Sequence, residues 1–553
     1  MGENHIRLLA WITFWHFAGL GLFSSGFFLS RLELPHLSAC NAPPPPPPPF
    51  SHPPYVAAVE GEAEVCWGAP RRYDRMVLVV IDALRFDFVF SRDEKPSPFH
   101  RHIPILAQTM RRAPERALLY QFEATPPTVT AQRLKGLSTG GLPTFMDMSK
   151  NFASPAVHAD NIVAQLARAG RRVVFMGDDT WEKLFPPALH FTRSSPFPSF
   201  NVKDLNTVDD GCTRLLTGRH PRPGSTPLGG GGGGVRGAAS AAASPEAQAA
   251  PPPKPELERD DWDVVIAHFL GVDHVGHRFG PNNPAMKTKL EEMNTVLSDV
   301  IEMLDERDEK TLLVIIGDHG MTADGNHGGA SKLERRSALF MYSGGKGALP
   351  FRGQGAAAES AAEATEIAPA TPRVVPQVDL LPSLSLILGV PIPFGSLGSI
   401  LPELFATDRV SPSRLPLQDR VLCVSPRHPN LSLFSLHLAL ALPPTMLCSF
   451  ISPQTHTHTH THTHTHTQKG ELHRALSINA AQVWSYLSTY VAVSPTFPSA
   501  AMRRLRAEYE EALRAGAAIE QSVEEGRSGG GTLRTQTYYR AWHSKLYGLL
   551  SLR

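Results

Sequence analysis

The chain has 553 residues, and its 53 Lys and Arg residues almost balance its 52 Asp and Glu residues. That length allows one large catalytic core beside smaller segments. A net charge of +1 excludes a whole-chain electrostatic field that would attract nucleic acid, so a nucleic-acid partner is not expected.

An apolar segment without charged residues lies near the start of the chain. It runs from Leu8 to Leu29, between Arg7 and Arg31, and is long enough to cross a bilayer. Because a cleaved signal peptide normally has a shorter apolar core, we expect residues 1–35 to hold an uncleaved signal anchor, a transmembrane helix. The flanking charges nearly cancel and leave its orientation open.

A Pro-rich spacer is expected at residues 36–71. Its run NAPPPPPPPFSHPP cannot pack as helix or sheet and is predicted to stand off from the membrane. Cys40 and Cys66 flank this run, so they could close a local disulfide in an oxidising compartment, with free buried thiols as the alternative. The few, irregularly spaced cysteines form no CxxC zinc motif.

The main core begins near residue 72, where short apolar runs alternate with helical patterns. Strands are expected at 76–81, 172–176, 263–269, 311–316 and 338–343. Continuous apolar strands separated by helices indicate an α/β fold with a mostly parallel sheet covered on both faces. One covering helix is clear, because apolar residues recur at steps of four and three from Met286 to Leu304.

Two segments interrupt this pattern. Residues 221–258 are of low complexity and are predicted to form a disordered surface loop within a catalytic domain at 72–410. Residues 411–469 are interpreted as an insert that contains THTHTHTHTHTHT, a repeat typical of a gene-model artefact; adventitious metal binding by its imidazoles is the alternative. Residues 470–553 resume a helical pattern and are predicted to pack as helices.

Acidic residues follow three of the predicted strands. Asp82, Asp273 and Asp318 each come after an apolar run. A single Asp in this place usually caps the next helix. Ligands of open α/β sheets bind beyond the carboxyl ends of the strands, so three such acids predict one shared crevice.

Histidines accompany these acids. Asp273 and His277 are four residues apart, which places both on one face of a helical turn. His319 follows Asp318 directly, and His327 lies in the glycine-rich segment DGNHGG. Carboxylates and imidazoles without thiolates favour zinc or manganese.

A candidate nucleophile lies in EATPPTVTAQRLKGLSTG. Thr130 immediately precedes a helical pattern, so its hydroxyl is expected to face the crevice from a helix N-terminus. A simple N-cap or turn threonine is the alternative interpretation. Thr128 is the second candidate nucleophile in the same segment.

These residues and their motifs resemble a known family. IDALRFD, GVDHVGH and GDHGMT resemble the alkaline phosphatase superfamily, especially its phosphodiesterase and phosphoethanolamine-transferase branches. RLKGLSTGGLPTF, GRRVVFMGDDTW, FPSFNVKDLNTVD and IAHFLGVDHVGH are similar to the glycosylphosphatidylinositol (GPI) ethanolamine phosphate transferase 3 family. The resemblance implies an alkaline-phosphatase-like core with a mostly parallel central sheet between helices.

The resemblance also implies a site with two divalent metal ions, zinc being expected and manganese the alternative. The implied ligands of one ion are Asp82, Thr130, Asp318 and His319, and those of the other are Asp273, His277 and His327. Thr130 would be the nucleophile. Asn161, in ADNIV, would contact a phosphate oxygen, although an amide on a surface helix has the same sequence pattern.

The implied activity is transfer of phosphoethanolamine from phosphatidylethanolamine to a mannose, expected to be the third, of the GPI precursor, through a phospho-threonine intermediate. The family implies an endoplasmic reticulum membrane location, a lumenal catalytic domain and a small stabilising membrane subunit. Its members have further transmembrane helices after the soluble domain. Residues 470–553 are therefore expected to lead into a membrane region that this sequence lacks.

Other readings of the same residues remain open. A phosphodiesterase or pyrophosphatase would use the same metals with water as acceptor. A non-enzymatic alternative is a truncated, membrane-tethered product without turnover. A sulfatase is not expected, because the sequence has no Cys-x-Pro-x-Arg segment.

Overall fold

A single sheet of eight strands forms the centre of the body, in the order β4-β3-β5-β1-β6-β7-β2-β8. The computed structural model describes residues 3–27, 33–44, 66–91, 97–142, 156–219, 254–351, 372–405, 462–493, 502–511 and 514. The strands are β1 (Arg75–Ile81), β2 (Ala117–Glu123), β3 (Val173–Asp178), β4 (Arg193–Phe197), β5 (Val264–Phe269), β6 (Thr311–Ile316), β7 (Arg336–Gly344) and β8 (Val374–Pro376).

Most strands of this sheet run parallel. Among the described strands, β7 is antiparallel to β6 and β2, and the other five pairings are parallel. The prediction of a mostly parallel α/β sheet is therefore confirmed. Because β5, β1 and β6 are parallel neighbours, their carboxyl ends lie at one edge of the sheet.

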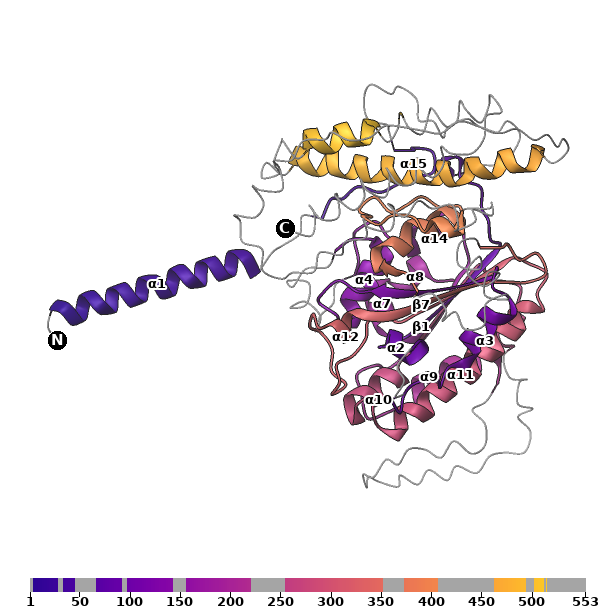
Figure 1. Cartoon of the computed structure of the whole chain (residues 1–553), viewed down its shortest axis with the longest axis horizontal. Coiled ribbons are helices and arrows are strands. Elements are labelled where there is room, and N and C mark those ends of the chain that lie inside the picture. Colours follow the sequence, from indigo (N-terminus) through magenta and orange to yellow (C-terminus); the bar gives the residue numbers. More distant parts are fainter. Residues whose placement is uncertain are drawn as a thin grey trace, which may run out of the picture.

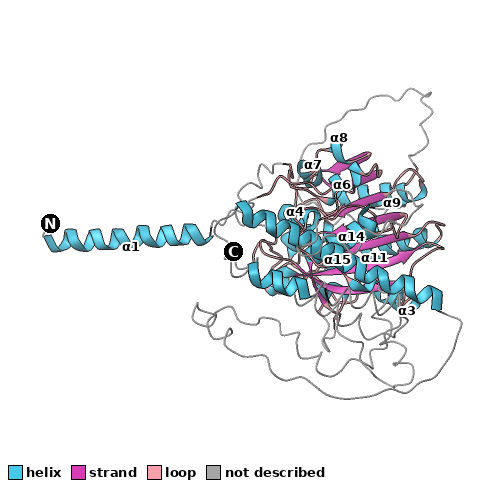
Figure 2. Ribbon diagram, turned by 90° about the horizontal axis from the view of Figure 1, so that it is seen from above, coloured by secondary structure: helices cyan, strands magenta, loops and turns pink. Residues whose placement is uncertain are grey.

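Helices cover both faces of the sheet, as Figures 1 and 2 show. On one face the apolar core includes residues of α4 (Thr130–Thr139), α6 (Ile162–Arg168), α7 (Thr180–Leu184), α14 (Leu380–Ile387) and α15 (His462–Val493). On the other it includes residues of α3 (Pro104–Arg112), α9 (Thr207–Thr217), α10 (Gly271–Phe279) and α11 (Pro284–Asp305). Short helices complete the body: α2 (Phe86–Val89), α8 (Pro187–His190) and α12 (Lys332–Arg335).

The sequence of β1 explains why both faces need a cover. Met76 and Val80 belong to the core on one face, whereas Val77, Val79 and Ile81 belong to the core on the other. Successive side chains of a strand point to opposite faces, so a continuous apolar run exposes apolar surface on both unless helices bury it.

Helix α11 confirms the clearest helical prediction. Its predicted apolar stripe is fully buried: Met286, Leu290, Met293, Leu297, Val300 and Leu304 are each at most 2% exposed. The helix starts with Pro284, and the Asn283 side chain caps it by accepting a hydrogen bond from the Ala285 amide.

Three strands, β2, β4 and β8, were not among those expected from the sequence. β4 (RSSPF) is largely polar and only partly buried, and β8 has three residues at the edge of the sheet. β2 (ALLYQFE) is buried, but its Ala and Leu residues are also typical of helices. Its place between β7 and β8 is a tertiary effect that local sequence does not encode.

Helix α1 (Glu3–Phe27) extends away from the body in Figure 1. Large apolar side chains are exposed along it, among them Trp11, Phe14 and Leu22. Its segment His5–Phe23 is, by length and composition, the one candidate membrane span within the described chain. A signal sequence meets the same criteria, so the uncleaved anchor stays a prediction.

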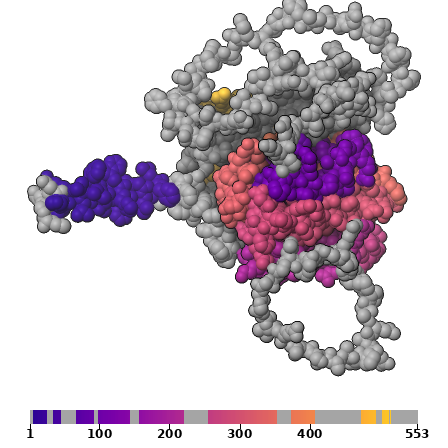
Figure 3. Space-filling view, turned by 60° about the horizontal axis from the view of Figure 1, so that its bottom comes forward, coloured from indigo at the N-terminus to yellow at the C-terminus, as the bar shows by residue number. Residues whose placement is uncertain are grey.

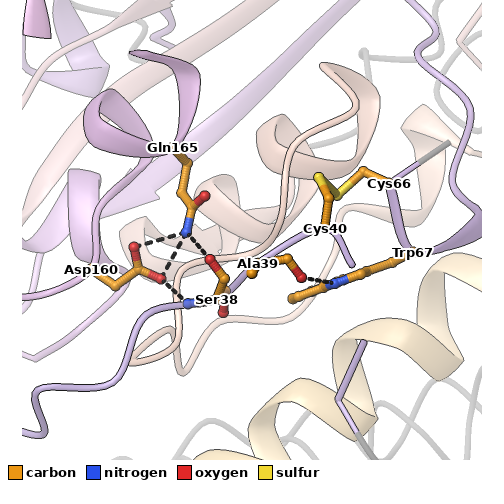
Figure 4. Close-up of a disulfide and its surroundings, with 7 residues drawn as sticks. All are labelled: Ser38, Ala39, Cys40, Cys66, Trp67, Asp160 and Gln165. Carbon is orange, nitrogen blue, oxygen red and sulfur yellow. Dashed lines mark hydrogen bonds between the residues drawn. A yellow bond between two sulfur atoms is a disulfide. The ribbon is translucent and has the colours of Figure 1, made fainter. Parts of the chain in front are cut away.

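A disulfide joins the segment that follows α1 to the body. Cys40 and Cys66 are bonded, which decides between the two alternatives open at the sequence level (Figure 4). Beside the bond, the Trp67 indole Nε1 donates a 2.8 Å hydrogen bond to the carbonyl of Ala39. Both flanks of the proline run are thus fixed to the same place.

Buried Asp160 holds this segment as well. Its Oδ2 accepts a 2.9 Å hydrogen bond from the Ser38 amide, and Gln165 Nε2 donates to the Ser38 carbonyl at 2.9 Å (Figure 4). The same carboxylate forms an ion pair with Arg168 and accepts from the Phe394 amide. The start of the spacer, up to residue 44, therefore packs on the body, and its distance from the membrane stays a prediction.

Loss of the disulfide is expected to destabilise the body. Replacing Cys40 and Cys66 by Ser removes a cross-link between residues 26 positions apart. The chain-entropy cost predicts a free energy of unfolding lower by about 3 kcal/mol. Urea unfolding followed by circular dichroism measures the change, with reductant lowering the wild-type value to that of the variant. Equal stability of the two proteins without reductant would contradict the expectation.

The low-complexity prediction at 221–258 is partly outside the described residues, which resume at 254. Its end does not form a disordered loop, so the prediction is wrong there. Glu256–Glu258 form a turn of 3₁₀ helix in which Leu257 is 2% exposed. Glu256 forms an ion pair with Arg193 of β4.

The C-terminal insert prediction lies mostly outside the described residues, which exclude 406–461. Helix α15 begins at His462, so the last residues of the Thr-His repeat have helical backbone. Farther along α15 the predicted apolar stripe is confirmed, with Leu476, Ala480, Val483 and Leu487 buried and Tyr490 partly buried. In Figure 1 this helix lies across the outside of α14.

Candidate active site

The carboxyl ends of the central strands bring the predicted acids together. Asp82 follows β1, Asp318 comes two residues after β6, and Asp273 lies in α10, directly after β5. His319 Nε2 is 3.3 Å from Asp82 Oδ1 and 3.4 Å from Asp318 Oδ2. Side chains that follow neighbouring strands thus lie close together at one edge of the sheet, as expected from strand topology.

Thr130 belongs to this first group of residues. Its Oγ1 donates a 3.2 Å hydrogen bond to Asp82 Oδ2 and lies 3.3 Å from His319 Nε2. The residue is the first of α4, and the N-cap position is Val129, which has no side-chain cap. The interpretation as an N-cap threonine is wrong, because the hydroxyl faces the acids instead of its own helix.

A second group consists of Asp273, His277 and His327. The Nε2 atoms of the two imidazoles are 2.9 Å apart. Each lies 3.4 Å from an oxygen of the Asp273 carboxylate. As predicted, Asp273 and His277 are on one helix, α10. The two groups adjoin, because the rings of His319 and His327 stack with centroids 4.0 Å apart.

Backbone carbonyls orient two of these imidazoles. Nδ1 of His319 is 2.9 Å from the carbonyl of Gly320, and Nδ1 of His327 is 2.8 Å from the carbonyl of Thr128. A carbonyl only accepts, so in the neutral ring Nδ1 carries the proton and Nε2 presents its lone pair to the acids. Burial lowers the pKa of His319 to about 4, which keeps the ring neutral at pH 7.

The negative charges of Asp82, Asp273 and Asp318 repel one another when no cation lies between them. Burial, followed by the charges of Asp318 and Asp273, raises the pKa of Asp82 well above its ordinary value. Burial would also raise the pKa of Asp318, but the nearby His319 and His268 imidazoles lower it overall. Among the described side chains, Asp82 Oδ1, Asp273 Oδ1 and Asp318 Oδ2 are buried without a hydrogen-bond partner.

These observations fit a bound cation. Oxygens buried without partners carry a desolvation cost that a divalent ion would offset. Both groups have ligand atoms close enough together to hold an ion. The donor set of carboxylates and neutral imidazoles is that of a divalent transition metal.

Thr128 has a different place from Thr130. It is fully buried, donates a 2.9 Å hydrogen bond to the carbonyl of Gly329 and accepts one from the amide of Gly328. Those contacts hold the loop that carries His327. Because the Thr128 hydroxyl is occupied by these backbone hydrogen bonds, Thr130 is the better candidate for the nucleophile.

Asn161 is not brought into this cluster by any described contact. It is the N-cap of α6, where its Oδ1 accepts from the Ala164 amide at 2.9 Å and its Nδ2 donates to the Ala159 carbonyl at 3.0 Å. Its side chain is 2% exposed. The phosphate-contact role stays a prediction, and the observed role is helix capping.

His268 and Asp178 are two site residues that the sequence reasoning missed. His268 Nε2 lies 3.4 Å from Asp82 Oδ2, and its Nδ1 lies 4.0 Å from Asp178 Oδ2. Both side chains are buried close to Asp82. The available sequence clue was Asp178, which ends β3 as the other acids follow their strands.

Trp181 is expected to position His268. Its indole Nε1 donates a 2.9 Å hydrogen bond to His268 Nδ1, so in the neutral ring Nε2 carries the proton and faces Asp82. Such outer contacts orient metal-binding side chains. Replacing Trp181 by Phe should weaken metal binding at the Asp82, Asp318 and His319 group by about tenfold, as measured by competition with a chromophoric chelator.

The control for this variant is Trp262→Phe. Trp262 is also fully buried, but its indole nitrogen has no hydrogen-bond partner in the described chain. Both substitutions remove similar bulk, but Trp262 packs against Arg75 and Arg307 and has no hydrogen bond to His268, so its variant controls for the loss of a buried indole elsewhere in the body. Equal metal affinities of the two variants would contradict a positioning role.

Comparison with known proteins is consistent with this geometry. Residues 146–336 match the family model for type I phosphodiesterase / nucleotide pyrophosphatase. The GPI ethanolamine phosphate transferase 3 catalytic subunit of Homo sapiens is 41% identical over 415 residues, covering 72% of this chain and 32% of the relative. The chain is thus similar over most of its own length to GPI ethanolamine phosphate transferase 3 proteins, and the predicted resemblance to this family is confirmed.

Other relatives carry related names. GPI ethanolamine phosphate transferase 3 of Schizosaccharomyces pombe is 37% identical over 390 residues, covering 70% of this chain and 35% of the relative. The transferase 2 catalytic subunit of Homo sapiens is 35% identical over 339 residues, covering 60% and 28%. The chain thus spans about a third of the length of these relatives.

Among solved structures, the zinc complex of the C-terminal periplasmic domain of EcEptC from Escherichia coli gives a TM-score of 0.34 at 10% sequence identity, covering 59% of this chain and 84% of that one. A TM-score this low does not establish that the two folds are the same. The assignment of the fold therefore rests on the sheet topology and on the sequence relatives.

Proposed function

We propose that this chain carries the catalytic domain of a GPI ethanolamine phosphate transferase. Its activity would be transfer of phosphoethanolamine from phosphatidylethanolamine to a mannose of the GPI precursor. The observation that carries the proposal is the Thr130 hydroxyl between Asp82 and His319, in a chain 41% identical to a protein of that name. The third mannose and a small stabilising membrane subunit remain parts of the proposal.

Two divalent ions would complete the site, with zinc expected and manganese the alternative. The proposed ligands are Asp82, Thr130, Asp318 and His319 for one ion and Asp273, His277 and His327 for the other. When bound, such ions neutralise phosphate charge and favour the deprotonated form of a nucleophilic hydroxyl.

The residues of the chain suit a double displacement at phosphorus. Thr130 gives up its hydroxyl proton toward Asp82, and its Oγ1 forms a bond to the phosphorus of the donor lipid. The bond to the diacylglycerol oxygen breaks, and that oxygen takes up a proton. A mannose hydroxyl then bonds to phosphorus and loses its proton, while the Thr130 oxygen leaves and regains one.

The proposed location is the endoplasmic reticulum membrane, with the body in the lumen. Helix α1 supplies a candidate anchor. The Cys40–Cys66 disulfide favours an oxidising compartment on the side of the body.

A transfer assay with the full chain tests the proposal. The protein is placed in vesicles that contain phosphatidylethanolamine with a labelled headgroup and a trimannosyl GPI lipid. Label on the GPI lipid supports the transferase. Release of free phosphoethanolamine without such transfer would instead support hydrolysis, the chemistry named in the matching family model. If neither product forms, the membrane-tethered, non-catalytic alternative is supported.

A further inference from the structure

A polar hollow of about 440 Å³ adjoins the candidate active site. Its walls are the end of α10, the start of α11 and residues of the loop before His327. α10 and α11 belong to the pink segments that make up much of the visible face of the body in Figure 3. The volume falls within the roughly 300–1,000 Å³ typical of small-molecule sites.

His277 connects this hollow to the reacting groups. Its side chain is part of the wall, and its Nε2 is 2.9 Å from that of His327. His327 stacks on His319, whose Nε2 lies 3.3 Å from Thr130 Oγ1. The wall of the hollow is thus connected to the nucleophile through successive contacts of three imidazoles.

The other walls combine an aromatic ring with planar polar groups. The Phe279 ring is 41% exposed, and the Arg278 guanidinium lies 4.8 Å from its centroid. Asn282 is exposed, and its side chain makes no hydrogen bond within the described part of the chain. Asp324 is also in the wall, and Asn326 Nδ2 donates a 2.8 Å hydrogen bond to its carboxylate.

The wall formed by the loop is rigidly placed against α10. Gly325 has φ +86°, and a Cβ there would lie 1.9 Å from the carbonyl oxygen of Gly276 in α10. Only glycine permits this approach. The carboxylate of Asp324 is therefore held at a fixed distance from α10, as binding sites require.

We propose that the hollow is the acceptor subsite and binds a hexose ring of the mannose type. This inference rests on the proposed transferase function and assigns a place to its acceptor. Amide, carboxylate and guanidinium groups pair with neighbouring hydroxyls, and an exposed ring covers the apolar face of a sugar. The ethanolamine headgroup is the alternative occupant, but its two-carbon ammonium would fill only a small part of the volume.

Binding of methyl α-mannopyranoside to the full chain, followed by saturation-transfer NMR, tests this assignment. Asn282→Ala and Phe279→Ala are each expected to weaken the affinity at least about fivefold, because a subsite depends on few contacts. Leu189→Ala is the control, since this side chain is 72% exposed on α8. Metal content and formation of the phosphoethanolamine–threonine intermediate from the donor lipid should match wild type in all three variants.

The outcomes separate the subsite from the proposed function. Absence of mannoside binding to wild type, or equal binding to all variants, would overturn the subsite. Weakened binding of O-phosphoethanolamine with unchanged mannoside binding would assign the hollow to the headgroup and also overturn it. A further outcome is mannoside binding that depends on Asn282 and Phe279 in a protein that forms no phosphoethanolamine–threonine intermediate. That result would support the subsite and refute the transferase.

Discussion

Replacing Thr130 by Ala is expected to abolish the covalent intermediate and to lower kcat for transfer by about 10⁴-fold or more, since losses of this size follow removal of a catalytic nucleophile. The Thr130 hydroxyl contacts the Asp82 carboxylate and the His319 imidazole. Metal affinity should fall less than activity, because Asp82, Asp318 and His319 remain as ligands.

Two matched variants sharpen this test. Thr130→Ser retains the hydroxyl and should retain the intermediate, which mass spectrometry detects as phosphoethanolamine on the peptide that begins α4. Thr128→Ala removes a hydroxyl that binds the backbone of Gly328 and Gly329, so it should perturb the His327 loop and leave residue 130 modifiable. Labelling of Thr128 in the Thr130→Ala variant would show that the nucleophile was assigned wrongly.

Replacing Asp318 by Asn is expected to lower metal content and, in the metal-free protein, to lower the pKa of Asp82. In the metal-bound protein the substitution removes a charged ligand, so metal content should fall and the unfolding temperature should decrease. In chelator-treated protein it removes the charge that, after burial, most raises the pKa of Asp82, so the pKa of Asp82 should fall in the metal-free variant.

The pH dependence of the stability of the metal-free protein follows from the interaction between Asp82 and Asp318. A carboxyl group whose pKa is raised in the folded state binds more protons there than in the unfolded state. Metal-free wild type should therefore lose stability as the pH rises through the folded-state pKa of Asp82, and Asp318→Asn should lose less. Thermal unfolding across this pH range, with Asp299→Asn as a control for a buried acid outside the site, measures the difference. Parallel pH profiles of wild type and Asp318→Asn would refute the coupling.

The parts of the site predictable from sequence are those with a short-range pattern. Asp318 and His319 follow an apolar strand, and Asp273 and His277 have helical spacing, so topology alone placed them at one edge. His268 could not be found in this way, because it is a polar residue inside an apolar strand. Its partners Asp82 and Trp181 come from distant parts of the chain.

The fold, like the site, was predictable only where a local sequence pattern determines the structure. The apolar runs of β1, β5 and β6 require burial on both faces, and that requirement is local. The antiparallel direction of β7 and the pairing of β2 with β8 depend on contacts between distant segments. The polar hollow beside His277 likewise forms only where α10 meets a loop some 50 residues later, at Gly276 and Gly325.

The Cys40–Cys66 bond changes how long the connection from α1 to the body can be. The proline run lies between the two bonded residues, so its length adds nothing to that connection. The connection from α1 to the body runs at most from Phe27 to Glu33, because Glu33 forms an ion pair with Lys135 of the body. Fully extended, it reaches roughly 20 Å. For a chain anchored by α1 as proposed, the body searches for lipid substrates in two dimensions, within a thin layer above the headgroups.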